Sequence, residues 1–238
     1  MIKKLLACLL VCSLLLSTCA FAAVVTDVDE SINPEAVNYL VDLGVLTTVK
    51  DEFLPSQTMT RAEYVDAVLR LIGVETGEYG GNGNHDIYDV TEYMEYYSAV
   101  LFALDMGLVA GNGDGTFRPK EVISVADAVV ILVRALGYDP LAQDAGGYVA
   151  GYVSRANRLD LLMGVTVSGE LTHDICAQLF YNALEVEILK AVSYGSDSVI
   201  LRTVEGETVL SEYHSIQQIT GLVTEQVYDV PEKNAHVR

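Results

Sequence analysis

A segment that begins near residue 60 recurs near residue 124, and this internal repeat constrains the fold more than any other feature of the sequence. The segments 60–74 and 124–138 align without a gap. In both, apolar residues recur at intervals of three and four, and a glycine follows them. This spacing predicts one amphipathic helix per copy, ended by the glycine. Repeated units of this size predict a fold in which neighbouring copies bury their apolar faces against one another.

A more divergent third copy begins at Thr172, where Ala177, Phe180, Tyr181 and Leu184 form the same apolar stripe. Each copy also has an upstream helix, and a loop joins its two helices. The upstream helices are expected from Asn33 to Gly44, from Tyr97 to Gly107, and through Tyr152 to about Gly164. The chain is therefore predicted to be mainly α, with three helix–loop–helix units.

Composition places the boundaries between these units. The first unit is expected at 23–75, the second at 86–140 and a degenerate third at 141–190, with polar or glycine-rich linkers at 75–86 and 139–147. After residue 190 the chain is rich in β-branched residues, and Glu205-Gly206 is typical of a hairpin turn. Residues 191–238 are therefore expected to form a small β-rich extension, which either packs on the helices or begins a further domain.

The first 22 residues have the pattern of a secretory signal peptide. Lys3 and Lys4 precede an apolar stretch, and Ala20 and Ala22 fit the small-residue rule for cleavage before Ala23. Two alternatives remain open: an uncleaved membrane anchor, and a lipid attached at Cys19. If residues 1–22 are removed, no stable membrane span is expected in the mature chain.

The charge of the chain excludes one class of partner. Its formal net charge is −19, and it becomes −21 when the two lysines of the signal peptide are removed. An acidic surface of this kind is unsuited to binding nucleic acid. Three of the four cysteines lie in the signal peptide, which leaves Cys176 without a partner for an intrachain disulfide. Cys176 lies beside an apolar stripe and is expected to be buried.

The start of the helix in the first unit carries an arginine that helix formation does not require. Thr60 and Glu63 have the spacing of a capping box, which accounts for both residues. Arg61 occupies the first helical position, where the helix dipole disfavours a cation. A guanidinium on this rigid turn could bind a carboxylate through its planar pair of donors. The alternative is an exposed arginine that only pairs with acidic neighbours.

Two motifs give the chain a family resemblance. The loop sequence "GNGDGTFRP" at 111–119 precedes a capped helix, and "TRAE" at 60–63 occupies the matching place in the preceding copy. With three helix–loop–helix units behind a signal peptide, the chain resembles the S-layer homology (SLH) family. The resemblance covers about residues 24–190. It implies a pseudo-threefold helical bundle that binds pyruvylated secondary cell-wall polysaccharide in a groove between repeats, with Arg61 contacting the anionic sugar.

The candidate carbohydrate-binding residues follow from this resemblance, and they are Arg61, Thr60, Glu63, Arg118, Tyr97 and His173. The chain departs from the family pattern at several of the matching positions. Val125 and His173 replace the arginine in the second and third copies, and Leu54 stands where Arg118 stands in the next copy. The chain has no tryptophan, so Tyr96 or Tyr97 is the aromatic candidate for contact with a sugar ring.

The remaining sequence features favour a protein without catalytic function. We find no pattern typical of a nucleophile with its base, a phosphate loop, a metal site or a cofactor site. The glycine-rich turn at 112–116 lacks the alternating acidic ligands of a calcium loop. The chain is therefore expected to be a secreted anchor that binds cell-wall polysaccharide at the surface of a bacterium. The alternative is a structural module of the surface layer that has lost wall binding and contacts other surface-layer proteins.

Overall fold

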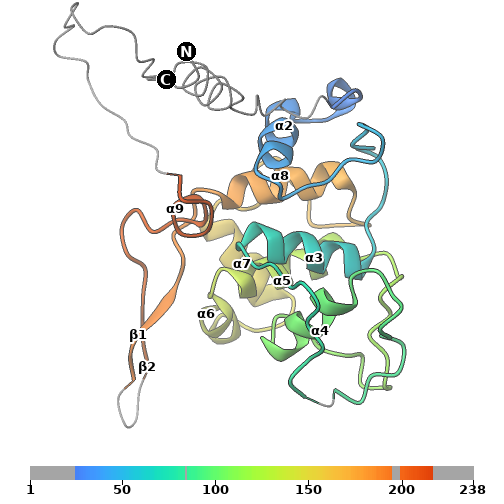
Figure 1. Cartoon of the computed structure of the whole chain (residues 1–238). Coiled ribbons are helices and arrows are strands. Elements are labelled where there is room, and N and C mark those ends of the chain that lie inside the picture. The colour runs from blue at the N-terminus through green and yellow to red at the C-terminus, as the bar shows by residue number, and fades with distance from the viewer. Residues whose placement is uncertain (1–24, 84, 195–198, 217–238) are drawn as a thin grey trace, which may run out of the picture.

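The computed structural model describes residues 25–83, 85–194 and 199–216, and they form a mainly helical fold. The predicted signal peptide, 1–22, and the end of the predicted extension, 217–238, lie outside the described residues. The expectation of a mainly α protein is confirmed (Figure 1). None of the helices in the described ranges is long and apolar enough to cross a membrane.

Three helices of equal length form the centre of the fold. These are α3 (Arg61–Leu71), α5 (Val125–Ala135) and α8 (His173–Ala183). Each begins where the sequence predicts, because a hydroxyl side chain accepts a hydrogen bond from the backbone amide three residues later. The hydroxyls are those of Thr60, Ser124 and Thr172.

Shorter elements surround these three helices. They are η1 (Val28–Glu30), α2 (Pro34–Asp42), α4 (Tyr97–Asp105), α6 (Asp139–Asp144) and α7 (Ala150–Arg158). The side chain of Asn33 caps α2, and Pro34 occupies its first turn, as the sequence predicts. Helix α2 packs on α8, α4 packs on α3, and α7 packs on α5 (Figure 1).

The segments that lead into α3, α5 and α8 meet at the centre and exchange backbone hydrogen bonds in a closed cycle. The amide of Met59 donates to the carbonyl of Leu171 at 2.9 Å, and the amide of Leu171 donates to that of Ile123 at 2.9 Å. The amide of Ile123 completes the cycle by donating to Met59 at 3.0 Å. All three side chains are buried. Because each segment binds the other two, the starts of the three helices are held at one end of the core.

The linker expected at 139–147 is in part wrong, because residues 139–144 form helix α6. Pro140 lies in the first turn of this helix, where a backbone amide has no acceptor within the helix, so the missing amide hydrogen of proline costs no hydrogen bond. Ala142 is fully buried, and Asp139 accepts a hydrogen bond from Arg134 of α5 at 3.1 Å. Tertiary contacts therefore stabilise a helix of only six residues.

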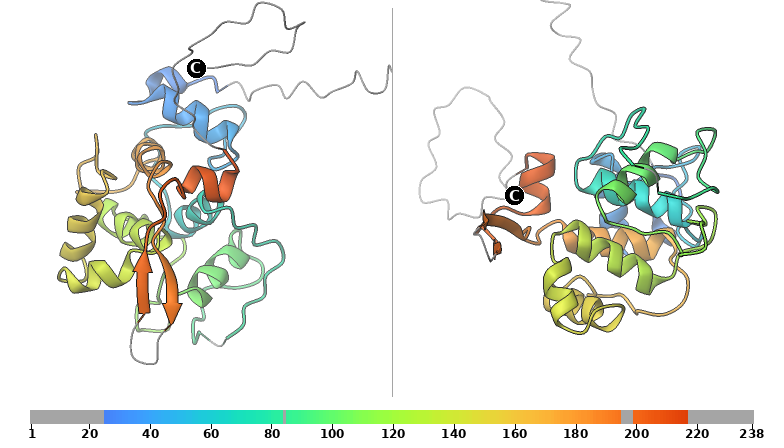
Figure 2. Two further views of the ribbon diagram at one scale, coloured as in Figure 1. Left: turned by 90° about the vertical axis from the view of Figure 1, so that its left-hand side faces the viewer. Right: turned by 90° about the horizontal axis from the view of Figure 1, so that it is seen from below.

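The C-terminal extension also differs from the expectation. An antiparallel hairpin of β1 (Lys190–Tyr194) and β2 (Val199–Arg202) stands apart from the helices (Figure 2). The predicted turn at Glu205-Gly206 is present, but it leads into helix α9 (Val209–His214) instead of another strand. Thr208 and Ser211 form a capping box at the start of this helix. The capping box and burial of the next two side chains prevail over the β propensity of this stretch.

Helix α9 packs against the central helices. Val209 and Leu210 are buried, and their amides donate to the carbonyls of Val186 and Leu184 at 3.2 and 2.9 Å. The imidazole Nε2 of His214 lies 2.9 Å from the carbonyl oxygen of Leu71, at the end of α3. Of the described part of the extension, helix α9 therefore packs on the helices, whereas the β1–β2 hairpin stands apart from them.

Candidate functional site

The capping box predicted at the start of α3 is confirmed. The hydroxyl of Thr60 accepts the amide hydrogen of Glu63, and the carboxylate of Glu63 accepts the amide hydrogen of Thr60 at 2.7 Å. The amide of Arg61 then donates to the carbonyl of Glu121, a residue of the neighbouring loop, at 2.9 Å. The backbone that carries Arg61 is thus held from both sides.

The Arg61 side chain lies against Phe117 of that loop. Its Nε donates to the Phe117 carbonyl at 3.0 Å, and the guanidinium carbon lies 4.7 Å from the centre of the Phe117 ring. Within the described residues, the two terminal nitrogens of Arg61 have no hydrogen-bond partner and form no ion pair with a carboxylate. A guanidinium held in this way keeps its paired donors for a ligand.

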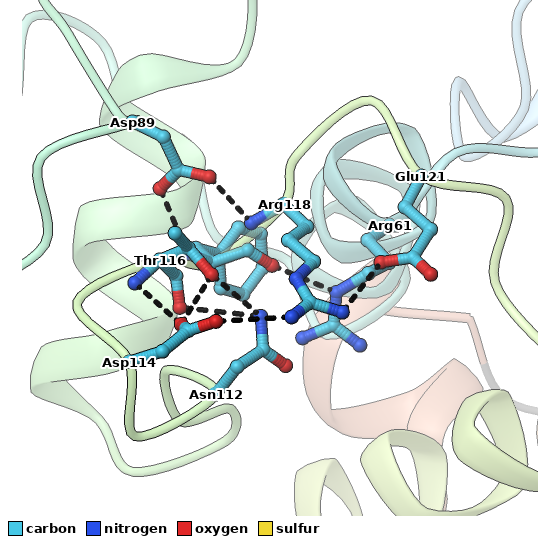
Figure 3. A network of polar contacts seen from close by, with 8 residues as sticks. Arg61, Asp89, Asn112, Asp114, Thr116, Arg118 and Glu121 are labelled. Carbon is cyan, nitrogen blue, oxygen red and sulfur yellow. Dashed lines mark hydrogen bonds and ion pairs between the residues drawn. The ribbon is translucent and has the colours of Figure 1, made fainter.

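An aspartate fixes the loop that holds Arg61. The two carboxylate oxygens of Asp89 accept the amide hydrogens of Phe117 and Arg118, both at 2.8 Å (Figure 3). Arg118 has a left-handed backbone with φ of 57°, which is uncommon for a residue with a side chain. The two hydrogen bonds to one carboxylate stabilise this conformation and so place the Phe117 carbonyl beneath Arg61.

Arg118 differs from Arg61 in its partners. Its side chain is half exposed and forms ion pairs with Asp114 at 3.0 Å and Glu121 at 3.7 Å (Figure 3). Hydrogen bonds from the Thr116 hydroxyl, Arg118 and the Thr116 amide lower the pKa of Asp114 to about 2. The same interaction with Asp114 raises the pKa of Arg118. Asp114 thus closes a tight turn and pairs with Arg118, a candidate residue that already has acidic neighbours.

His173 occupies the position in α8 that Arg61 occupies in α3, and its contacts are equivalent. Its Nδ1 lies 2.8 Å from the carbonyl oxygen of Phe53, and the two ring centres are 5.7 Å apart. Both carboxylate oxygens of Asp27 accept amide hydrogens from Phe53 and Leu54 at 2.7 Å. Leu54 has the same left-handed backbone as Arg118, with φ of 57°.

The same contact with a loop carbonyl thus occurs twice. We call Asp89, Phe117 and Arg61 the arginine station, and Asp27, Phe53 and His173 the histidine station. Burial raises the pKa of Asp27, but the hydrogen bonds from Phe53 and Leu54 oppose this effect, and the net result is a lowered pKa. The carboxylate of Asp27 is therefore the stable form against the loop.

The third equivalent position is different. Val125 begins α5 and is fully buried, whereas Arg61 and His173 are half-buried. The amide of Val125 still donates to the Gly169 carbonyl at 3.1 Å, but the loop before α8 has no phenylalanine. An open hollow beside this helix start is lined mainly by apolar side chains, among them Val149, Val153 and Val167.

Among the candidate carbohydrate-binding residues, Tyr97 has no described contact with the other candidates. It is half-buried at the first position of α4, and in the described ranges it has no hydrogen bond to Arg61, Arg118 or His173. Its neighbour Tyr96 packs against the core and has a left-handed backbone. Burial, with the charges of Glu95 and Glu63, raises the pKa of Tyr96 to about 12.

The sequence interpretation missed the roles of Asp27 and Asp89, and with them the purpose of the two phenylalanines. The rings of Phe53 and Phe117 are both buried, and their carbonyls are the acceptors for His173 and Arg61. A signal was present, because each aspartate precedes a valine and stands upstream of one of these phenylalanines. The contact of the two phenylalanine carbonyls with Arg61 and His173 crosses between units and has no signal in the local sequence.

Other chemistry-bearing residues fit structural roles. Cys176 is fully buried, as expected, and burial raises the pKa of its thiol. His85 contacts the carboxylate of Asp105 at 2.9 Å. Asp105 also accepts hydrogen bonds from Tyr79 and the Asn82 amide, and these three contacts fasten the first linker to α4. In the described part of the chain, no cluster of three or more histidine, cysteine and acidic side chains could hold a metal.

Comparison with known proteins gives a family. The family model described as "S-layer homology domain" matches residues 26–65 and 86–129. All residues of the arginine station lie in the two matched segments, and so do Asp27 and Phe53 of the histidine station. His173 lies outside them. Each match begins close to the aspartate of a station and ends in the first half of α3 or α5.

Three relatives are proteins of bacterial envelopes. The chain is 29% identical over 163 residues to the middle cell wall protein of Brevibacillus brevis. It is 30% identical over 165 residues to the surface layer protein of Brevibacillus choshinensis. Each of these alignments covers 68% of the chain. The cell surface protein of Thermoanaerobacter kivui is 29% identical over 232 residues, or 94% of the chain.

All three relatives are much longer than this chain. The alignments cover 15%, 14% and 29% of their respective lengths. The similarity therefore concerns one region of each relative. The chain belongs to the S-layer homology family, as a secreted, wall-associated protein of the bacterial cell surface.

Proposed function

We propose that the chain is a noncatalytic anchor that binds a carboxylate-bearing cell-wall polysaccharide, such as a pyruvylated secondary polymer, at the arginine station. Arg61 would bind the carboxylate, while Thr60 and Glu63 hold the helix turn that carries it. Arg118 and Tyr97 are proposed as further contacts at the rim of the same groove. Attachment of this kind would hold the protein, and any cargo joined to it, on the wall.

One observation carries this proposal: the Arg61 guanidinium is fixed by Phe117 and keeps two donors without a partner in the described residues. An arginine that served only a surface ion pair would contact a carboxylate, as Arg70, Arg118 and Arg134 do. The carboxylate of Glu121 is close, but its ion pair is with Arg118. The stacked, preorganised side chain therefore favours ligand binding over surface pairing.

The high negative charge of the protein supports binding by local contacts. The long-range electrostatic field of a chain with this negative charge would repel an anionic polymer. A fixed guanidinium can still bind a carboxylate, because charge-assisted hydrogen bonds act over short distances. Wall binding is accordingly expected to require Arg61 itself and to gain little from positive side chains outside this groove.

We also propose that the three helix–loop–helix units, at 23–75, 86–140 and 141–190, are SLH repeats arranged about a pseudo-threefold axis. The hydrogen-bond cycle of Met59, Ile123 and Leu171 supports this arrangement, since each unit donates one bond and accepts one. In such an arrangement each station lies between two units. The arginine station combines the first and second units, and the histidine station combines the third and first.

A cosedimentation experiment tests the anchor function. The protein from residue 23 onward is mixed with cell walls that carry a pyruvylated polysaccharide, and with the same walls after the pyruvyl groups are removed by mild acid. Arg61→Ala should lower affinity more than tenfold, because one charge-assisted contact contributes about 1.5–3 kcal/mol. Removing the pyruvyl groups should have a similar effect on the unmodified protein.

Arg158→Ala provides the matched control, since it removes an exposed arginine of α7 that, in the described ranges, forms no hydrogen bond or ion pair with a residue of either station. It should bind walls as the unmodified protein does. If Arg61→Ala also binds normally, the anchor proposal fails and a module for contacts with other surface-layer proteins becomes the better function. The apolar hollow beside Val125 and Val153 would then be the first surface to examine.

A further inference from the structure

A tyrosine side chain rests on the loop of the arginine station and is otherwise exposed to solvent. Tyr88, the residue before Asp89, is 72% exposed, and its hydroxyl has no hydrogen-bond partner within the described residues. Its amide donates to the carbonyl of Gly115 at 3.0 Å. A Cβ on Gly115 would lie 3.0 Å from Cε1 and 3.1 Å from Cδ1 of Tyr88, so the ring packs directly on the glycine backbone. The ring is therefore held in place although most of it faces solvent.

The histidine station shows that the loop does not need this ring. Thr26 precedes Asp27 there, and its amide donates to the carbonyl of Asp51 at 2.9 Å, as the amide of Tyr88 donates to Gly115. The φ angle is 66° at Asp51 and 81° at Gly115, so a residue with a side chain adopts the same left-handed backbone. The backbone of a station thus requires neither the tyrosine nor the glycine. What Gly115 adds is room for the ring.

The turn that carries Gly115 is polar, since residues 112–116 read Asn-Gly-Asp-Gly-Thr. The side-chain nitrogen of Asn112 donates to the carbonyl and the hydroxyl of Thr116, both at 3.2 Å, and the side-chain oxygen of this exposed residue stays available as an acceptor. A single ring beside polar groups is too small for a stable protein interface, which buries about 800 Å² on each partner. It matches a sugar, whose C–H groups pack on the negative face of an aromatic ring while its hydroxyls form hydrogen bonds at the rim.

We propose that Tyr88 is a stacking platform for a neutral sugar unit of the wall polysaccharide, next to the unit whose carboxylate binds Arg61. This inference rests on the proposed anchor function and adds to it a subsite that the second helix–loop–helix unit forms alone. The loop connects the two contacts, because Gly115 supports Tyr88 and Phe117, two residues later, holds Arg61. Two residues span at most about 7 Å of chain, so one polymer can reach both side chains.

Three probes separate the two contacts. They are the polysaccharide released from pyruvylated walls, the same polysaccharide after mild acid has removed the pyruvyl groups, and a methyl hexoside that carries one pyruvyl ketal. Calorimetry uses the protein from residue 23 onward. Tyr88→Ala should lower the affinity for the intact polysaccharide about three- to tenfold, the contribution of one aromatic stacking contact. It should bind the methyl hexoside as the unmodified protein does, because this probe has no neighbouring sugar.

Further variants of position 88 test the ring itself. Tyr88→Phe keeps the ring and should bind like the unmodified protein, whereas Tyr88→Thr, with the residue of the histidine station, should bind like Tyr88→Ala. The chain has no tryptophan, so Tyr88→Trp supplies a single indole reporter on the platform. Its fluorescence should change with either polysaccharide, including the acid-treated one. Tyr93→Trp is the matched control at a residue that is 90% exposed, and its fluorescence should not respond.

The outcomes distinguish this inference from the proposed function. If Tyr88→Ala binds the intact polysaccharide normally, the platform is refuted, but the anchor function stands as long as Arg61→Ala loses the methyl hexoside. Equal losses for the polysaccharide and the methyl hexoside would give Tyr88 a structural role in the loop and would also refute the platform. A Tyr88→Trp signal that follows protein concentration instead of polysaccharide would assign the ring to a contact between copies of the chain. If Arg61→Ala binds the methyl hexoside normally, the anchor function itself fails.

Discussion

The imidazole Nδ1 of His173 lies 2.8 Å from the carbonyl oxygen of Phe53, a residue 120 positions earlier in the chain. This contact matches that of Arg61 with Phe117, including the aspartate that holds the loop. The two stations therefore share one backbone geometry and differ in the side chain at the helix start.

The aspartates of the two stations give a matched pair of variants. Asp89→Ala and Asp27→Ala each leave two loop amides without an acceptor, so each should lower the free energy of unfolding by about 1–3 kcal/mol. Urea denaturation measures this loss. Only Asp89→Ala should weaken wall binding at about pH 7.5, because only Asp89 positions the loop beneath Arg61. Equal effects of both variants on binding would contradict the assignment of this site.

The N-cap of α3 should affect stability more than binding. Thr60→Ala removes the hydroxyl that accepts the Glu63 amide hydrogen and should lower the free energy of unfolding by about 1 kcal/mol. Thermal denaturation followed by circular dichroism tests this value. The folded variant keeps Arg61 and its contact with Phe117, so its wall binding should fall by less than that of Arg61→Ala. A binding loss as large as that of Arg61→Ala would mean that Thr60 contacts the sugar directly.

An arginine in place of the first residue of α5 should destabilise the fold, whereas an arginine in place of the first residue of α8 should not. Val125 is fully buried, so Val125→Arg must bury a charge or distort the core, at a cost above about 3 kcal/mol. His173→Arg places the guanidinium at a half-exposed position beside a carbonyl acceptor, and it should fold with little change in stability. Urea denaturation of both variants makes the comparison, and equal stability would contradict the difference in burial.

Two glycines test whether the segment that leads into the C-terminal extension packs on the core. Gly107 and Gly137 both have positive φ, so an alanine costs about 1–2 kcal/mol at either position. A Cβ on Gly107 meets nothing, whereas a Cβ on Gly137 lies 2.1 Å from the carbonyl oxygen of Leu189. Gly137→Ala should therefore cost about 1–3 kcal/mol more than Gly107→Ala. Equal melting temperatures would show that residues near 189 do not pack there in solution.

Acid should destabilise the loop at the histidine station. The pKa of Asp27 is lowered from the value of 3.8 for the free side chain. Its contribution to stability is therefore complete above about pH 4 and is lost as the pH falls through the lower pKa of the folded state. Asp27→Asn cannot titrate and should show a smaller loss of stability than the unmodified protein below about pH 4. Identical slopes of stability against pH would contradict this.

The sequence by itself determined the starts of α3, α5 and α8 and the capping box of Thr60 and Glu63, because capping and amphipathic packing depend on residues three or four positions apart. It also identified Arg61 as a residue that the start of the helix does not require. It could not predict α6 and α9, whose short segments become helical only when Ala142, Val209 and Leu210 are buried.

The stations belong to the tertiary structure alone. Residues from two different units meet in each station, and the hydrogen-bond cycle at Met59 sets which units are neighbours. The same assembly buries Val125 but leaves Arg61 and His173 at the surface, although all three occupy the first position of a helix. A local sequence pattern sets the face on which a side chain lies, but the packing of distant segments sets what covers that face.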